Sequence, residues 1–471
     1  MRLHARDRRF SATAGGTPAA PDRSPRPAIP ILGAITSISG PRFTIRHSIS
    51  VINLRPFRLV VGVVSFCCTG FGTGGFHPVR ADDDPTGATA RTRVVPLVFS
   101  SDNTEVAFGL GGVSIGAGQA QAALFGLGFK SENDSSGISV GALNYQIPDL
   151  PRWYFSGFFY QSDMPNYRYF VSDSPGFATR SNDSTPQFNT LGLNDLVARI
   201  QARWILPIGA GKNEGFRLSK RVILPEQSQP RISLDPQQSG VSSIRFEWEQ
   251  HQRDFAESSG VTRSGSDVFR LRFDWDNTGS RLIPNSGGRA RFASHWGRNH
   301  AGGGQWRLYE GALSGFIGLP TSQRWARQQV LALNLHATVT PTWDSFTEQN
   351  RPPEYLGARL GGLMRLRGYR GSRFYDQSSW AYSAEYRLIP TWQPLAKVFS
   401  QLGYRVPWWQ LAVFTDLGRV APHFDISEFH RDMRSTAGMG LRILAEGLLI
   451  RIDFARSNEE SATLVTIDQT F

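Results

Sequence analysis

The segment "VFRLRFDWD", residues 268–276, alternates strictly between apolar and charged side chains after its first residue. The apolar residues are Phe269, Leu271, Phe273 and Trp275. The charged residues between them are Arg270, Arg272, Asp274 and Asp276. A period of two places successive side chains on opposite sides of a β-strand, so this segment predicts a strand with one apolar and one charged face.

The same alternation recurs along most of the chain and decides the predicted fold class. It is found near residues 104–114, 118–129, 135–146, 151–163, 243–250, 287–298, 304–318, 326–341, 380–388, 408–419, 434–445, 447–456 and 463–471. Many of these strands are longer than in a soluble sandwich, where turns recur every ~8–12 residues, and short turns alternate with long loops. At ~9–11 residues per crossing, about 16 strands fit. The sequence therefore predicts an all-β fold, a transmembrane antiparallel β-barrel of about 16 strands.

The N-terminal 81 residues have the composition of an export leader. Two arginines, Arg55 and Arg58, precede an apolar core at about 59–66, and the segment closes on small residues, with cleavage predicted after Ala81. We expect a short periplasmic linker at 82–94 and an outer-membrane β-barrel at 95–471. Nothing in residues 1–55 fixes the true start site. Both cysteines, Cys67 and Cys68, fall in the leader, so no disulfide framework is expected after cleavage.

The formal charge of +12 does not indicate a nucleic-acid partner. Residues 1–81 hold 11 arginines and two acids, which leaves 40 basic and 37 acidic residues in the remaining chain. No cofactor is expected, no metal site and no catalytic residue. The nine histidines show no HExxH spacing, and no G-x-S-x-G motif lies at a strand-to-helix turn. We therefore predict that the chain is not an enzyme.

The last residues, "TLVTIDQTF" at 463–471, read as a closing strand. In an extended chain Val465, Ile467 and Phe471 share one face, and Thr466, Asp468 and Thr470 share the other. A closing amphipathic strand that finishes on a terminal aromatic resembles the recognition signal of outer-membrane barrels. A soluble edge strand can end in the same way.

A loop of about 37 residues, long for a compact protein, separates the strands at 326–341 and 379–389 and contains "RLRGYRG" at 365–371. Because it is rich in Gly and aromatic residues, we expect it to be ordered and folded back into the lumen. Arg367 then needs a carboxylate. Two acids fall on the lumen faces of the next two strands: Glu385, and Asp416 with Phe414 and Gly418 on its face. A basic surface turn and unpaired acids in a water-filled pore are the alternatives.

The combination "LGG…LRGYRGSRFYD…AYSAEYRLIP…FTDLG…GMGLRI…IRIDFA…TIDQTF" resembles the C-terminal barrel of the BamA/TamA/FhaC superfamily, the bacterial surface antigen family. The resemblance is strongest over about 355–471. It implies a 16-stranded barrel whose long sixth extracellular loop carries a (V/I)RG(F/Y) tip, and whose arginine pairs with acids on the two following strands. The tip corresponds to Leu366, Arg367, Gly368 and Tyr369, with Leu366 where Val or Ile is usual. The paired acids correspond to Glu385 and Asp416.

The resemblance implies a role in inserting or transporting proteins or lipids at the outer membrane. Family members that assemble or translocate proteins carry periplasmic POTRA modules before the barrel, and the span between Ala81 and the first strand is too short for one. We therefore expect a POTRA-less barrel, in contact with outer-membrane lipid, that works with a separate periplasmic partner or with another copy of itself. A passive channel or structural surface protein is the alternative.

Overall fold

The computed structural model describes residues 91–101, 105–119, 121–170, 180–214, 233–256, 264–280, 282–344, 350–401, 403–445 and 448–471. The chain divides into the units Met1–Leu54 and Arg55–Phe471, and all of the described residues belong to the second. The predicted leader, its cleavage site and residues 82–90 of the predicted linker lie outside the described residues.

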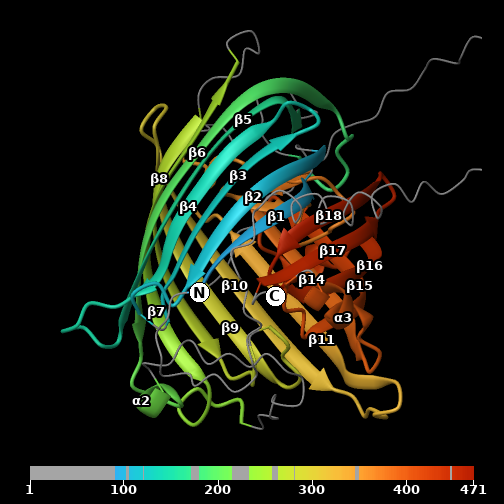
Figure 1. Cartoon of the computed structure of the whole chain (residues 1–471). Coiled ribbons are helices and arrows are strands. Elements are labelled where there is room, and N and C mark those ends of the chain that lie inside the picture. The colour runs from blue at the N-terminus through green and yellow to red at the C-terminus, as the bar shows by residue number, and fades with distance from the viewer. Residues whose placement is uncertain are drawn as a thin grey trace, which may run out of the picture. The chain divides into compact units, whose positions relative to one another are not determined.

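One antiparallel sheet of 16 strands makes up the fold, and each strand pairs with its neighbour in the chain (Figure 1). Its strands are β1 (Arg91–Ser101), β2 (Glu105–Ile115), β3 (Ala123–Ser131), β4 (Ser136–Tyr145), β5 (Trp153–Phe170), β6 (Phe188–Ile205), β7 (Val241–Phe255), β8 (Ser264–Asp276), β9 (Gly287–Asn299), β10 (Gln305–Gly318), β11 (Ala326–Val339), β14 (Ser378–Pro390), β15 (Trp408–Ala421), β16 (Arg434–Ala445), β17 (Leu448–Arg456) and β18 (Ser461–Ile467). This confirms the predicted all-β barrel of about 16 strands.

The alternation in the sequence separates an outer apolar face from an inner face. Large apolar side chains such as Leu271, Leu333 and Val413 are exposed on the outer face. Residues one position away in the same strands, among them Ala332 and Ala412, are buried. Because neighbouring strands keep their register, the exposed residues form a continuous apolar surface suited to lipid. Among the residues described, no helix is long and apolar enough to cross a membrane.

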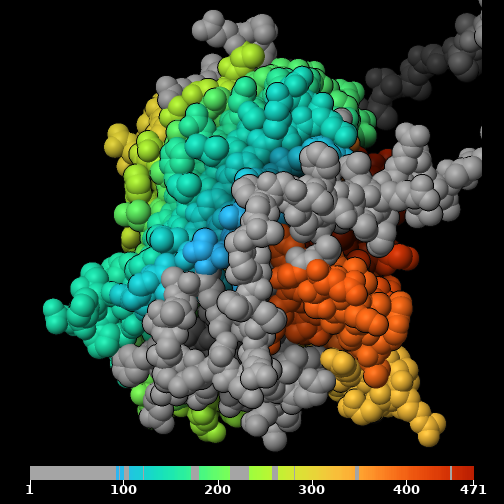
Figure 2. Space-filling view, in the orientation of Figure 1, coloured from blue at the N-terminus to red at the C-terminus, as the bar shows by residue number. Residues whose placement is uncertain are grey.

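The two edge strands of the sheet, β1 and β18, come back together as the sheet curls round. Their Cα atoms approach within 8 Å, and the blue β1 and the red β18 lie next to each other in Figure 1. The space-filling view shows blue N-terminal strands and orange C-terminal strands on the same side of the molecule (Figure 2). The hydrogen-bonded strand order nevertheless ends at β1 on one side and at β18 on the other. We call this junction the seam.

The remaining elements lie in connections. β12 (Ala358–Leu360) and β13 (Phe374–Asp376) pair with each other within the loop between β11 and β14. We call this loop, residues 340–377, the lock loop. The short helices are α2 (Gly211–Glu214), α3 (Pro394–Gln401) and α4 (Ile426–Phe429).

The N-terminal strands differ from the sequence prediction at two places. The barrel begins at Arg91 instead of residue 95, since Thr92 to Val94 pair with β2 despite their mixed polarity. The strand predicted at 104–114 is therefore the second strand of the barrel. β6 was missed because Val197 and Ile205, on its inner face, are apolar and blur the alternation.

Candidate functional site: the lock loop and its anchor

The lock loop is anchored at Arg367, whose side chain is completely buried inside the barrel. Its Nε and Nη2 donate to the two carboxylate oxygens of Asp416 on β15, at 2.9 and 2.8 Å. Its Nη1 donates to Glu385 Oε1 on β14 at 2.6 Å. The structure thus brings together the arginine and both acids that the sequence singles out, in the two-point geometry that makes guanidinium–carboxylate pairs strong.

Two further residues of β15 shape the surface that receives the loop. The guanidinium carbon of Arg367 lies 3.4 Å from the centre of the Phe414 ring, in a cation–π contact. A methyl group built on Gly418 would come within 3.0 Å of Leu360 and 3.2 Å of the Trp380 carbonyl oxygen. Gly418 therefore provides the room in which β12 approaches the barrel wall.

The loop tip is held by shape as well as by charge. Leu366 is fully buried with φ of 48°, a left-handed backbone that is uncommon for a residue other than glycine. A Cβ on Gly368 would lie 2.6 Å from the carbonyl carbon of Arg456 and 2.7 Å from the nitrogen of Ser457. The tip can therefore rest against the β17–β18 turn only with glycine at 368.

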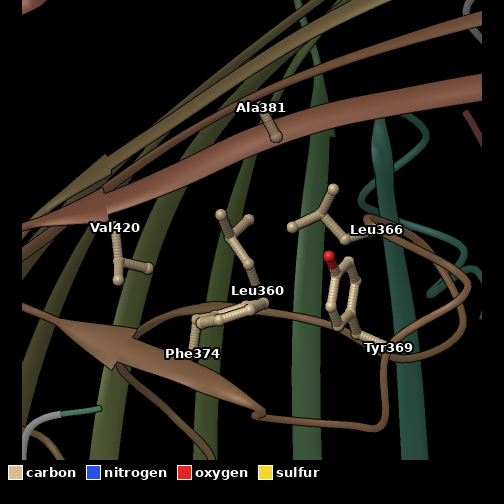
Figure 3. Close-up of a cluster of buried hydrophobic side chains, with 6 residues drawn as sticks. All are labelled: Leu360, Leu366, Tyr369, Phe374, Ala381 and Val420. Carbon is tan, nitrogen blue, oxygen red and sulfur yellow. The ribbon is translucent and has the colours of Figure 1, made fainter. Parts of the chain in front are cut away.

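Apolar packing continues from the tip to the barrel wall. Leu360, Leu366, Tyr369 and Phe374 of the loop form one buried cluster with Ala381 of β14 and Val420 of β15 (Figure 3). Tyr369 stacks edge-on against Phe374, with 5.1 Å between ring centres, and its hydroxyl donates to Asn458. The loop is thus packed as a piece of core and is not a solvated turn.

Four charged residues of the anchor were not singled out from the sequence: Arg387, Arg442, Arg451 and Asp453. Asp453 on β17 accepts from Arg367 Nη1 at 3.1 Å and lies 3.2 Å from Arg442 Nη1. Arg387 and Arg442 both contact Glu385, at 2.8 and 3.3 Å. Alternation places all four on the inner face, but only the curl of the sheet shows that β16 and β17 share the loop's anchor.

The anchor is a buried network of four arginines and three acids. Each of these side chains is at most 1% exposed. Arg442 and Arg451 are directly opposite each other on β16 and β17, an unfavourable pairing that Asp453 offsets by lying between them. Because a buried charge that loses its partner is costly, Arg367 stabilises the network chiefly through Asp416, which pairs with no other arginine among the described residues.

The chain terminus also enters the barrel, which corrects the prediction for Phe471. β18 ends at Ile467, and Asp468 turns the chain inward with φ of 81°. Val465 and Ile467 stay on the outer face, whereas Phe471 packs inside against Phe316, Val330 and Ala332. Period two describes a residue's face only while the strand continues, so the prediction fails beyond Ile467.

Thr470 connects this terminus to the anchor. Its hydroxyl donates to Glu385 Oε1 at 3.0 Å and accepts from Arg451 Nη1 at 2.7 Å. The loop, the four strands β14 to β17 and the terminus that follows β18 therefore share one polar network.

The lock loop has a second set of contacts, made with other loops at the same end of the barrel. Arg180, between β5 and β6, exchanges backbone hydrogen bonds with Tyr375 and lies 2.6 Å from the carboxylate of Glu354. Arg373 pairs with Glu459, in the β17–β18 turn, at 2.8 Å. Burial raises the pKa of the Tyr375 hydroxyl and raises the pKa of the Asp376 carboxyl to about 6.

The residues of this site hold the lock loop against the barrel wall. Most of its polar contacts join a guanidinium group to a carboxylate, a hydroxyl or an aromatic ring. Within the described ranges no group of His, Cys, Asp and Glu has the arrangement of a metal site. The network fixes the lock loop to strands β14 to β17. Strands β1 and β18, which form the seam, contribute none of its arginines or acids.

Comparisons with known proteins match the chain to one family profile and to several solved structures. The family profile described as the Omp85 superfamily domain matches residues 211–469, more than half of the chain. No curated protein matches the sequence.

Among solved structures, BamA from Haemophilus ducreyi lacking POTRA domains 1–3 is 11% identical, with a TM-score of 0.45 over 87% of this chain and 76% of that chain. CdiB from Acinetobacter baumannii is 11% identical, with a TM-score of 0.45 over 80% of this chain and 59% of that one. CdiB from Escherichia coli is 10% identical, with a TM-score of 0.46 over 80% and 66%.

Proposed function

The chain belongs to the Omp85 superfamily, and from that membership we propose that it aids the insertion or transport of proteins or lipids at the bacterial outer membrane. It is a bacterial outer-membrane barrel. In this proposal it acts together with a periplasmic partner protein, which delivers the cargo to the barrel.

The observation that carries the proposal is the contrast between the anchored wall and the seam. Arg367, Glu385, Asp416 and Asp453 cross-link the lock loop to three wall strands through buried ion pairs. β1 and β18 lie side by side at the two ends of the strand order, and fewer of their residues approach each other than in any two strands that are neighbours in that order. Because the fewest residues have to separate there, the seam is the place where the wall can open at least cost.

An open seam offers a specific chemical surface. The edge of β1 would present unpaired backbone N–H and C=O groups to the membrane, where such groups have no water to bond. An incoming strand can satisfy them by adding to the edge. β1 has 11 residues and β18 has 7, so a cargo strand can pair with more of β1 than β18 does.

The test is to close the seam covalently in the full chain. One cysteine in Arg91–Ser101 and one in Ser461–Ile467, with Cys67 and Cys68 replaced by serine, are screened for the pair that forms a disulfide. In liposomes the oxidised protein should stop accelerating the insertion of a test barrel, and reduction should restore the acceleration.

The matched control is a disulfide between two laddered strands. Ile452 and Val465 are directly opposite on β17 and β18, so cysteines there leave the seam free and should not reduce insertion. Equal insertion with the seam open and closed would refute the proposal. A steady conductance without assisted insertion would favour the alternative role of a passive channel.

A further inference from the structure

A second group of arginines lies on the inner wall, away from the anchor, on β6 to β9. Two to four residues closer to the lock-loop end of these strands, opposite charges face each other: Arg199 is across from Glu249, and Glu247 is across from Arg270. Their side chains are in contact: Arg199 pairs with Glu249 and lies 3.5 Å from Glu247, and Arg270 Nη1 lies 2.5 Å from Glu247. We call this set the paired belt. It shows that the fold can neutralise charges across these same strands.

The next inward-facing positions break that rule. Arg203 on β6 is directly across from Arg245 on β7, and Arg245 is directly across from Arg272 on β8. Neighbouring strands are ~4.8 Å apart, so three guanidinium-bearing residues follow one another over ~10 Å of wall. Like charges directly opposite each other destabilise a sheet. We call these three residues, with Arg291 of β9 and the nearby Asp274, the arginine cluster.

A single carboxylate holds most of this cluster. Asp274 lies 2.9 Å from Arg245 Nε, 3.0 Å from Arg272 Nε and 3.3 Å from Arg291 Nε. Arg203 Nε donates instead to the hydroxyl of Ser243 at 3.0 Å. Three guanidinium groups therefore share Asp274, and one carboxylate balances only one guanidinium charge.

Two arginines and one acid of the arginine cluster are enough to leave a net positive charge. Among the described residues Arg272 and Arg291 have Asp274 as their polar partner, and these three side chains sum to one positive charge. Asp276 is engaged by Arg289 at 3.0 Å, and Glu310 on β10 by His336 at 3.3 Å. The side chains of Arg272 and Arg291 are 23% and 46% exposed, so an anion in the lumen can reach them.

We propose that the arginine cluster binds a phosphate-class oxyanion in the lumen, at the end of the barrel opposite the one from which the lock loop leaves. Guanidinium groups match phosphate oxygens in a planar two-point geometry. Asp274 contacts Arg272 and Arg291 through their Nε atoms. Among the described residues, the terminal guanidinium nitrogens of these two arginines therefore remain available to donate to the phosphate oxygens. A phosphate group supplies the negative charge that offsets this excess, and its several oxygens can accept from both guanidinium groups at once. The source is free phosphate or the phosphate of a lipid headgroup.

The test measures phosphate binding to the full chain, folded in detergent, from the shift in its thermal unfolding midpoint. Sodium phosphate is titrated against sodium chloride at constant ionic strength, because screening alone changes surface electrostatics. A second titration uses dihexanoyl phosphatidic acid below its micelle concentration. A shift with both ligands assigns the site to phosphate in general, and a shift with the lipid alone assigns it to a headgroup.

Two substitutions test the residues, and a third is the matched control. Arg272→Gln and Arg291→Gln should each weaken phosphate binding at least about tenfold, as expected for the loss of a charged hydrogen-bonding group. Arg298→Gln removes the same charge from β9 at an exposed position on its outer face and should bind phosphate like the wild type. Because Arg272→Gln also relieves repulsion, its unfolding midpoint in chloride should not fall.

Four results would overturn the proposal: equal responses to phosphate, sulfate and chloride; no shift with either phosphate ligand; an equal loss in Arg298→Gln; or a lower midpoint of Arg272→Gln in chloride together with an unchanged phosphate response. A shift with poly-glutamate but not with phosphate would instead assign the cluster to an acidic polypeptide. This inference does not rest on the proposed insertion activity.

Discussion

Replacing Arg367 by alanine removes the central guanidinium group of the buried network. The contacts in the structure show which acid then loses its counter-charge. Glu385 keeps Arg387, Arg442 and Thr470, and Asp453 keeps Arg442 and Arg451. Asp416 accepts four hydrogen bonds, of which the Arg367 side chain supplies two. Those from the Arg367 backbone and Thr436 remain. The main cost is therefore one buried carboxylate without a counter-charge.

Breaking a buried ion pair by removing one partner costs about 3–5 kcal/mol. Since Asp416 keeps two hydrogen bonds, we expect the lower end, about 3 kcal/mol, for Arg367→Ala. Adding Asp416→Asn removes the stranded charge and should recover about 1–2 kcal/mol, because a neutral amide is cheaper to bury. The double variant should therefore be more stable than Arg367→Ala alone.

The measurement is urea unfolding of the folded barrel in detergent, with trypsin cleavage in residues 340–377 as a local readout. Arg370→Ala is the matched control from the same loop. Arg370 pairs with Glu460 at 2.9 Å, but both side chains are about a quarter exposed, so the change should cost at most about 1 kcal/mol. Equal unfolding and equal cleavage of the Arg367→Ala and Arg370→Ala variants would refute the argument that the buried network holds the loop.

Three further changes probe the tip, the terminus and the second contact of the lock loop. Gly368→Ala should expose the loop to trypsin as strongly as Arg367→Ala does, because the added methyl would overlap backbone atoms of the β17–β18 turn. Thr470→Val removes hydrogen bonds to Glu385 and Arg451 and should lower the free energy of unfolding by about 1–3 kcal/mol in the urea assay. Asp376 has a pKa raised to about 6 by burial, so its protonated form favours the docked loop. Stability from this group is complete below its ordinary pKa of 3.8 and should fall by about 3 kcal/mol as pH rises through 6, a slope that Asp376→Asn removes.

Two controls separate these effects from general damage. Gly315→Ala places a methyl group where no atom lies within 4 Å and should leave trypsin cleavage unchanged. Thr466→Val changes a threonine of β18 upstream of the inward turn, and it should cost less than Thr470→Val. If either control matched its partner variant, the specific contacts assigned to Gly368 or Thr470 would be wrong.

The alternation of apolar and charged residues by itself determined most of the strands, their inner and outer faces and the barrel class. It does so because a strand's faces follow from local geometry alone, with a period of two. The composition of the lock loop and the inner-face positions of Glu385 and Asp416 were likewise visible in the sequence. The Val465 and Ile467 face of β18 also followed from this period.

Only the tertiary structure decided which inner-face residues meet. Asp453 and Thr470 join Arg367 because the sheet curls until β17 and the terminus come close to β14, and no local pattern encodes that approach. The inward turn of Phe471 depends in the same way on an apolar pocket made by β10 and β11. The like-charged register of Arg203, Arg245 and Arg272 is also a product of strand pairing. Local periodicity specifies a face, whereas a contact between distant strands requires the closed geometry of the whole sheet.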